Sequence, residues 1–238
     1  MEWPLNNRDG WRRCRKPDGM EADIFCASDP VTGSGCYLLV KNGTCAVVDA
    51  GCFPLPAPAL SGHVPAFLPV FLTHGHCDHI SALNSLREHF PVLTVCSRAC
   101  SEEIQDTKAN MSRRMEAFLY YKSNETKLTP YAPFRCGPAD LCFEEEIRFL
   151  LGGWRLHMKR LPGHTPGSSV ISLDGALFSG DYLLPGERVV TRLPGGSQEQ
   201  YETYTRPWLQ TIAEGTWIYP GHGREFQMCG EARRFHEL

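Results

Sequence analysis

Residues 73–79 read Thr-His-Gly-His-Cys-Asp-His and follow an apolar run, Phe67–Leu72, that predicts a buried strand. Three imidazoles and one carboxylate therefore fall close together just after a strand. Histidine is the commonest metal ligand in proteins, and imidazole combined with carboxylate suits zinc, iron or manganese. The stretch thus predicts a metal site at the end of a strand.

The spacing within this stretch bears on how many ions it holds. His74 and His76 are two residues apart, so on an extended strand end their side chains point the same way and can share an ion. Asp78 and His79 are adjacent and diverge, which favours a second ion or the other side of the first. A structural zinc site closes with four protein ligands, often at Cys-x-x-Cys spacing. The sequence contains no such pair, and its histidine–carboxylate set is typical of a site that keeps a position open for water.

Three further candidate ligands share one pattern, in which a short apolar run precedes a glycine-rich loop that carries His or Asp. They are His164 in Leu-Pro-Gly-His-Thr-Pro-Gly, Asp181 at the end of Leu-Phe-Ser-Gly-Asp, and His222 in Tyr-Pro-Gly-His-Gly. Loops at strand ends are where layered folds place their functional residues. The histidines that lack this setting are His63, His89, His157 and His236.

Together these residues resemble the metallo-β-lactamase-fold hydrolases, whose pattern is His-x-His-x-Asp-His, then a lone His, a lone Asp and a final His. The resemblance extends from about residue 22 to residue 225. It implies an α/β (α+β) fold, a four-layer αββα sandwich of two mixed β-sheets flanked by helices, as one domain over residues 1–238. It also implies that His74, His76 and His164 hold one ion, that Asp78, His79 and His222 hold another, and that Asp181 bridges the two.

Within that family the chain looks most like the small glyoxalase II-like (hydroxyacylglutathione hydrolase-like) proteins. The phrases that carry this likeness are Gly-His-Thr-Pro-Gly-Ser at 163–168, Phe-Ser-Gly-Asp at 178–181, Arg-Leu-Pro-Gly-Gly at 192–196 and Tyr-Pro-Gly-His-Gly at 219–223. The likeness implies a dinuclear hydrolase in which a metal-bound hydroxide attacks a thioester or ester carbonyl. Two divalent ions are expected, zinc first, with iron or manganese as alternatives, and Asp78 orients the nucleophile or takes up its proton.

One departure from glyoxalase II concerns the C-terminal part. Glyoxalase II carries a sizeable helical domain after its core, whereas only residues 182–238 follow Asp181 here and must also supply His222. This argues against a glutathione thioester. Two alternatives therefore stay open: a lactonase on the same scaffold, and a mononuclear iron persulfide dioxygenase in which the second site is empty.

Four residues are expected to support the ligands or contact the substrate. The segment Val48-Asp49-Ala50-Gly51 resembles the early Asp-x-Gly of the family, whose Asp supports the ligand loop from behind, and Thr73 would lie beside it. Tyr182 follows Asp181 directly and would line the pocket. Arg192 would hold a substrate carboxylate by a bidentate contact.

Composition narrows the class of protein. The chain has 238 residues, 42% hydrophobic and 21% charged, which is ordinary for a globular protein. A net charge of −3 indicates neither nucleic-acid nor anionic-membrane binding. No apolar run is long enough to span a membrane, and the N-terminus does not resemble a signal peptide. We therefore expect a cytoplasmic enzyme with a small-molecule substrate, and its oligomeric state stays open.

The eleven cysteines are unusual for such a chain. In a reducing cytosol a disulfide framework is not expected, so most of them, such as Cys36, Cys45 and Cys96, are interpreted as small buried hydrophobes. Cys77 lies inside the ligand stretch and is interpreted as a bystander.

The pattern of the remaining sequence predicts the elements around the site. Strands are predicted at 22–27, 36–41, 44–49, 67–72, 92–96, 147–151, 155–161, 169–173, 176–179 and 217–219, with Asn42-Gly43 as a hairpin turn. Helices are predicted at 80–90, 101–127 and 198–213, and a proline-rich loop at 52–65. The helix at 101–127 is predicted to begin at a cap on Ser101, and residues 97–146 are expected to form a helical insertion that covers the substrate pocket.

Overall fold

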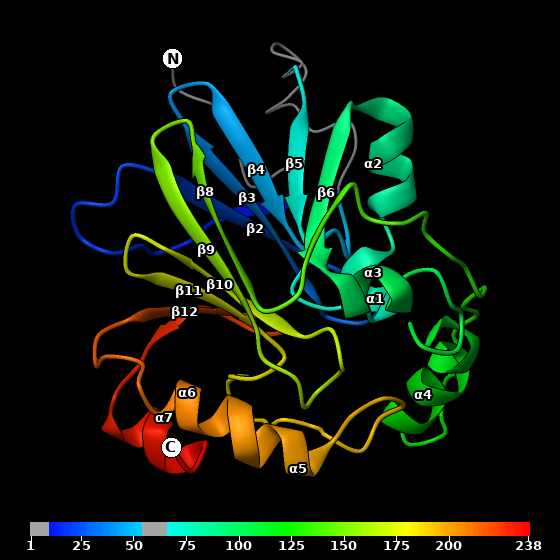
Figure 1. Cartoon of the computed structure of the whole chain (residues 1–238). Coiled ribbons are helices and arrows are strands. Elements are labelled where there is room, and N and C mark those ends of the chain that lie inside the picture. Colours follow the sequence, from blue (N-terminus) through cyan, green and yellow to red (C-terminus); the bar gives the residue numbers. More distant parts are fainter. Residues whose placement is uncertain (1–9, 54–65) are drawn as a thin grey trace.

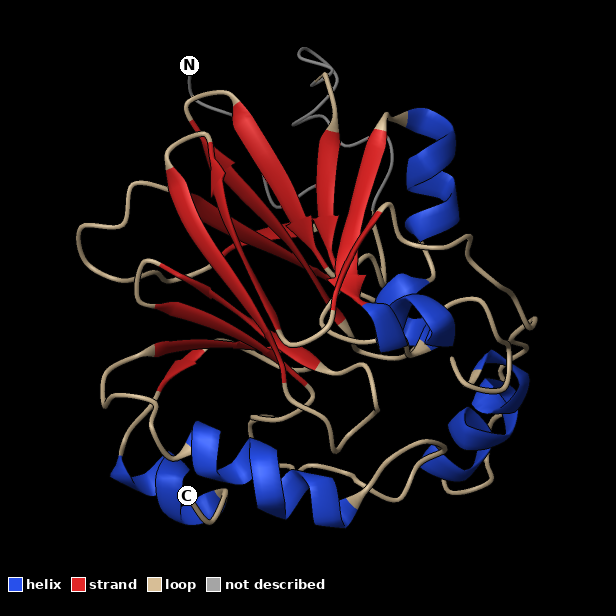
Figure 2. Cartoon of the chain, viewed as in Figure 1, coloured by secondary structure: helices blue, strands red, loops and turns tan. Residues whose placement is uncertain are grey.

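The computed structural model describes residues 10–53 and 66–238. Two β-sheets pack face to face, and helices lie outside both of them (Figures 1 and 2). The four-layer αββα sandwich predicted from the sequence is therefore confirmed.

The first sheet has seven strands that follow one another in chain order. They are β1 (Trp11–Arg13), β2 (Asp23–Ser28), β3 (Gly35–Lys41), β4 (Thr44–Val48), β5 (Leu68–Phe71), β6 (Val92–Ser97) and β7 (Leu141–Phe143). Strands β1 to β4 pair antiparallel, and β4 to β7 pair parallel. Asn42 and Gly43 have φ of 49° and 79°, so the predicted hairpin turn between β3 and β4 uses two left-handed residues.

The second sheet has six strands in the order β13-β12-β11-β10-β9-β8. They are β8 (Glu146–Leu151), β9 (Trp154–Arg160), β10 (Ser169–Leu173), β11 (Ala176–Gly180), β12 (Trp217–Pro220) and β13 (Phe226–Gln227). All neighbours pair antiparallel except β11 and β12, which are parallel.

The main core lies between the sheets and draws large side chains from both. Tyr37 of the first sheet packs edge-on against Phe178 of the second at 5.3 Å between ring centroids, and Phe178 stacks on Tyr219 at 4.8 Å. Trp154 is fully buried in the same cluster. Burying one such side chain is worth about 1.5–3 kcal/mol, so this cluster fixes how the sheets sit on each other.

The helices lie outside the two sheets, and several of them pack on an outer face. They are α1 (Cys77–Ile80), α2 (Leu83–His89), α3 (Arg98–Glu103), α4 (Met115–Lys122), α5 (Gln198–Gln200), α6 (Arg206–Leu209) and α7 (Gly230–Phe235). Leu83 and Leu86 of α2 are buried against the first sheet, and Leu209 of α6 is buried against the second. Figure 1 shows α5, α6 and α7 together beneath the second sheet and α4 standing off to one side.

The prediction of a single helix at 101–127 is wrong. Helix α3 begins earlier, with Ser97 as its cap accepting from the Cys100 N–H at 3.2 Å, and ends at Glu103. Asp106 Oδ1 then accepts from the N–H groups of Lys108 and Ala109, at 2.6 and 3.3 Å. These side-chain acceptors compete with helical hydrogen bonds and break the helix. Met111 is left-handed, with φ of 65°, before the chain resumes in α4.

The chain between α3 and β7 makes an excursion, residues 112–133, whose two ends are held together. Asn110 Nδ2 donates to the Phe134 carbonyl at 2.9 Å. Ser112 Oγ donates to the same carbonyl at 3.1 Å and accepts from the Phe134 N–H at 3.1 Å. Helix α4 lies inside this excursion, so its position depends on a closed base.

Other boundaries differ in smaller ways. The helix predicted at 80–90 is shorter, because α2 begins at Leu83 and ends at His89, and the preceding α1 was not predicted. The helix predicted at 198–213 ends at Leu209 and contains a π-helical turn at Tyr201–Thr205. Pro207, just after this turn, has no N–H to continue a regular helix. The short elements β1, β7, β13 and α7 were not predicted, and most of the predicted loop at 52–65 lies outside the described residues.

All eleven cysteines fall within the described residues, and none of them forms a disulfide. Cys36, Cys45 and Cys96 are at most 3% exposed, as predicted for buried hydrophobes. Among the described residues no helix combines the length and apolar character needed to cross a membrane.

Candidate metal centre

The seven candidate ligands come from four segments that each follow a strand. The stretch from His74 to His79 follows β5, His164 follows β9, Asp181 follows β11 and His222 follows β12. Backbone hydrogen bonds join these segments: the Ser169 N–H donates to the Thr73 carbonyl at 2.7 Å, and the Gly221 N–H to the Gly180 carbonyl at 2.8 Å. The structure therefore gathers all seven at one end of the sandwich.

The first group is made of three buried histidines that point at one another. His76 Nδ1 lies 3.2 Å from His74 Nε2 and 3.0 Å from His164 Nε2. All three side chains are at most 5% exposed. His164 Nδ1 lies 2.7 Å from the Val190 carbonyl, to which it can only donate, so His164 Nε2 carries a lone pair.

The second ring nitrogen of His74 fixes its tautomer in the same way. Thr73 Oγ1 donates to Asp49 Oδ2 at 2.7 Å and so accepts from His74 Nδ1 at 3.1 Å. His74 Nε2 therefore also carries a lone pair. Two lone pairs face His76 Nδ1, and one proton there can satisfy only one of them, whereas a cation satisfies all three nitrogens. The three-histidine group therefore fits a metal ion.

The second group joins His222, His79 and Asp78. His222 Nε2 lies 3.2 Å from Asp78 Oδ2, and His79 Nε2 lies 3.9 Å from the same oxygen. Asp181 lies between the two groups, because its Oδ2 is 3.6 Å from His164 Nε2 and 3.7 Å from His222 Nε2. Its Oδ1 is 3.3 Å from His79 Nε2. One carboxylate thus reaches both groups.

Asp49 is close to His74 and His79 but is already occupied by other donors. It accepts from the Thr73 N–H and hydroxyl, each at 2.7 Å, and its Oδ2 lies 3.1 Å from His79 Nδ1. At 2% exposure it has no room for more partners. Asp49 and Thr73 therefore orient two ligand imidazoles from behind, the arrangement by which carboxylates support metal-bound histidines.

The second group carries buried atoms that the protein itself does not satisfy. His79 Nε2 and Asp181 Oδ1 are buried and have no hydrogen-bond partner among the described residues. Burial by itself lowers the pKa of His79, but the carboxylates of Asp181 and Asp78 raise that pKa well above its usual value. Such a cluster of carboxylates around an imidazole attracts positive charge, and a divalent cation supplies it as well as a proton does.

The protonation states of one ligand in each group also favour metal binding. Burial, together with the neighbouring His164, lowers the pKa of His76 to about 3. Burial would raise the pKa of Asp78, yet the charges of His79 and His222 lower it to about 2. At neutral pH His76 is thus neutral and Asp78 ionised, the forms in which these side chains bind metals.

Two glycines let the backbone come close to the ligands. A Cβ on Gly221 would lie 2.0 Å from Asp181 Oδ1 and 2.8 Å from His79 Cε1. A Cβ on Gly51 would lie 2.0 Å from the Asp78 carbonyl oxygen. No side chain fits at either position without moving a ligand residue.

A cavity of about 440 Å³ opens over the two groups, a size that suits a small molecule. His76, Asp78, His164, Asp181 and His222 line its floor. Its walls are mostly apolar, from Met111, Met115, Phe118, Leu119, Leu184, Val190 and Leu193, and its lining also includes Lys122, Glu187 and Arg192. The excursion 112–133 thus contributes one wall of the site.

The two substrate-contact residues expected from the sequence differ in outcome. Arg192 lines the cavity and is exposed. Tyr182 does not: it is 2% exposed, and its hydroxyl donates to the Leu161 carbonyl and accepts from the His164 N–H at 3.3 Å. The expectation that Tyr182 lines the pocket is therefore wrong, because the chain after Asp181 turns into the core.

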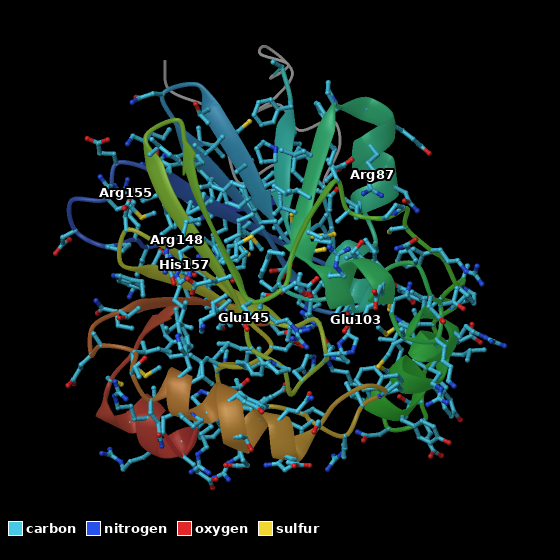
Figure 3. All side chains as sticks on the ribbon, viewed as in Figure 1. Arg87, Glu103, Glu145, Arg148, Arg155 and His157 are labelled. Carbon is cyan, nitrogen blue, oxygen red and sulfur yellow. The ribbon has the colours of Figure 1, made fainter. Side chains whose placement is uncertain are left out.

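Sequence reasoning missed Glu103, the last residue of α3, which is 7% exposed and contacts two ligand loops. It lies far from every histidine motif in the sequence. The only signal was an acidic residue at a position that proves to be buried, and a single sequence does not reveal that burial. Figure 3 labels it beside α3.

Comparison with known proteins agrees with this geometry. The metallo-beta-lactamase superfamily profile matches residues 30–222. A probable metallo-hydrolase of Bacillus subtilis is 30% identical over 166 residues, which cover 69% of this chain and 72% of that protein. A hydroxyacylglutathione hydrolase of Haemophilus influenzae is 27% identical over 173 residues, covering 69% of this chain and 72% of that one.

A solved structure supports the same fold. The crystal structure of BLEG-1, a B3 metallo-beta-lactamase, superposes with a TM-score of 0.65 at 20% identity, over 95% of this chain and 97% of that one. The family profile covers most of the chain and includes every candidate ligand. This protein therefore belongs to the metallo-beta-lactamase superfamily.

Proposed function

We propose that this protein is a dinuclear metal-dependent hydrolase of thioesters or related esters. The observation that carries the proposal is the position of Asp181, whose Oδ2 lies within 3.7 Å of a nitrogen from each histidine group. His74, His76 and His164 would hold one ion, and Asp78, His79 and His222 the second, with Asp181 shared. Zinc is the first expectation for such nitrogen and oxygen ligands, with iron or manganese as alternatives.

The bound ions would supply a water of lowered pKa and an electrophile for the carbonyl oxygen. The protein itself would supply orientation. Asp49 and Thr73 hold the imidazoles of His74 and His79 in fixed tautomers. Asp78 remains ionised at neutral pH because the neighbouring His79 and His222 lower its pKa, although burial opposes this. As an ionised ligand of the second ion it would also help to orient the attacking water.

The cavity walls favour an acyl group of modest size. Met115, Phe118 and Leu119 form an apolar surface beside the ligands. Lys122 and Arg192 add positive charge to the lining, so a carboxylate on the substrate would find a partner there. A thioester with an apolar acyl group and an anionic leaving group fits both features. The relative named hydroxyacylglutathione hydrolase supports the thioester class.

The excursion 112–133 would act as the cover of this pocket within the helical insertion at 97–146. Its residues line one wall, while the ligands come from strand ends elsewhere in the chain. Substrate preference would then be set by α4, and the chemistry by the loops below it.

The test is elemental analysis of protein purified without added metal, combined with a thioester assay on the same sample. The proposal expects about two divalent ions per chain and thioester turnover that disappears on chelation and returns with zinc. One iron per chain, no thioester turnover and oxygen uptake with a persulfide would instead indicate the dioxygenase. Turnover of lactones but not of thioesters would indicate the lactonase.

A further inference from the structure

Glu103 is a buried acid that hydrogen-bonds to two separate ligand loops. Its Oε2 accepts from the Gly75 N–H at 3.2 Å, between His74 and His76 in sequence. Its Oε2 also accepts from the Thr165 hydroxyl at 3.1 Å, and its Oε1 accepts from the Gly167 N–H at 2.7 Å. One carboxylate at the end of α3 thus joins the first histidine loop to the loop that carries His164.

Helix α3 is pressed against both loops at positions where no side chain fits. A Cβ on Gly75 would lie 2.5 Å from Glu103 Cβ, and one on Gly167 would lie 2.3 Å from the Cys100 nitrogen. Ser97, which caps α3, also donates from its hydroxyl to the Gly167 carbonyl at 2.7 Å. The helix is therefore built into the space between the loops.

Burying a carboxyl group here is costly. Among the described residues no Lys, Arg or His lies within ion-pair distance of Glu103, and burial raises its pKa to about 7 despite the three hydrogen bonds and the more distant charge of Arg160. A buried acid without an ion-pair partner is uncommon in a core that needs only packing. Such a residue is expected where its acceptors do something that an apolar side chain cannot.

The contacts of Glu103 are selective for one of the two histidine groups. Gly75 lies between two ligands of the three-histidine group, and Thr165 is adjacent to the third, His164. In the described part of the chain, Glu103 makes no hydrogen bond to Asp78, His79 or His222.

We propose that Glu103 is a positioning residue that fixes the spacing of the two loops and thereby sets the metal affinity of the three-histidine group. This role rests on the proposed metal ligand set.

The test compares Glu103→Gln with Glu102→Gln, which makes the same change at an exposed position on the same helix. Gln keeps the size of Glu but replaces one acceptor by an NH₂ donor, so the N–H of either Gly75 or Gly167 loses its acceptor. Zinc affinity is measured by competition with a chromophoric chelator. A His222→Ala background leaves only the three-histidine group complete, and a His164→Ala background leaves only the other.

The expected result is a 10–100-fold loss of zinc affinity for Glu103→Gln in the His222→Ala background, with none in the His164→Ala background. Glu102→Gln should match its parent in both. Unchanged affinity in both backgrounds would overturn the proposal. An equal loss in both, with a lowered melting temperature of the metal-free protein, would also overturn it, because that result means general damage to the fold.

The wild-type protein separates this role from the proposed function. If it binds no zinc, both proposals fail together. If it binds two zinc ions and Glu103→Gln binds them equally well, only the role of Glu103 fails.

Discussion

At the scale of single residues, Gly221 has no side chain because the second ligand group occupies the space. The nearest atoms to a Cβ there belong to Asp181 and His79. An alanine at this position would push the shared carboxylate away from both groups rather than open a cavity.

We therefore expect Gly221→Ala to lose at least one metal ion per chain and most hydrolytic activity, while the fold remains. The measurements are metal content and circular dichroism of the purified variant. Gly230→Ala is the control, because a Cβ there meets only a flexible arginine end at 3.6 Å. Full metal content in Gly221→Ala would show that the close approach of the Gly221 backbone to Asp181 and His79 is not needed for metal binding.

His76→Ala tests the first group directly. It removes the nitrogen on which His74 and His164 converge, so zinc affinity of that group and turnover should fall by at least about a hundredfold. The melting temperature of the metal-free protein should change little, because in the described part of the chain the His76 side chain is hydrogen-bonded only within its own group. His157→Ala, on β9 and remote from the ligand set, is the control. Normal turnover by metal-depleted His76→Ala would contradict the mechanism.

The ligands were predictable because each one stands in a short glycine-rich motif after an apolar run. The residues around them were not. The prediction that Tyr182 lines the pocket rests on its neighbour Asp181. Adjacent side chains can point in opposite directions, and Tyr182 points into the core. Glu103 reaches the loops only through the path of α3, which the sequence pattern did not place.

At the scale of elements, α4 presents an apolar wall to the cavity while remaining partly exposed. Phe118 is 43% exposed and lines the cavity. Its contact with a substrate would be the same before and during the reaction, so it would affect binding rather than the rate of the chemical step.

Phe118→Ala should therefore raise KM for thioesters with apolar acyl groups by about 5–30-fold, from roughly 1–2 kcal/mol of lost apolar contact, with kcat within about twofold. Steady-state kinetics on a series of acyl lengths would measure it. Tyr121→Ala, on the same helix, is a suitable control because Tyr121 is 68% exposed and does not line the cavity. A loss confined to kcat would contradict a binding role for α4.

The segment around α4 also shows where element prediction failed. Periodic spacing of Met111, Met115 and Leu119 indicated one helix, and these residues do lie together in the cavity wall. Met115 and Leu119 belong to α4, whereas Met111 is a left-handed residue before it, because Asp106 and Asn110 accept hydrogen bonds from nearby backbone N–H groups and interrupt the helix. Local competition of this kind depends on side-chain geometry that periodicity does not report.

At the scale of the whole molecule, Glu225 ties the first strand to the C-terminal part of the second sheet. Arg12 of β1 donates to both of its oxygens, at 2.8 and 2.6 Å, and the Arg15 N–H donates at 3.0 Å. The Glu225 side chain is only 5% exposed. This ion pair adds to the hydrogen bonds that join the two sheets, such as the one from the Tyr37 hydroxyl to the Pro220 carbonyl at 2.6 Å.

Glu225→Gln should lower the free energy of unfolding by about 1 kcal/mol at neutral pH. Burial raises the pKa of Glu225, but hydrogen bonds from Arg12 and the Arg15 N–H lower it below its usual value. The stabilisation is therefore present above about pH 4.3, the pKa of the unfolded carboxyl, and is lost as pH falls through the lower folded-state pKa.

Melting temperatures of both proteins between neutral and acidic pH would test this. The two curves should converge at low pH, where the wild-type carboxyl is protonated. Glu231→Gln, an exposed acid nearby in the chain, should leave the curve unchanged. A constant difference at every pH would mean that the charge of Glu225 plays no part.

The layered arrangement of the whole chain was predictable, since strand-forming runs in two blocks allow few other solutions. The closed base of the excursion 112–133 was not, and it has a consequence for the history of the protein. Asn110 and Ser112 hydrogen-bond to Phe134 and hold the two ends of the excursion together. The loop between these ends can therefore be replaced by another loop without changing the rest of the fold. Grafting a relative's loop at these two points should transplant its substrate range onto an unchanged reaction centre, a route by which one scaffold diversifies without rebuilding its chemistry.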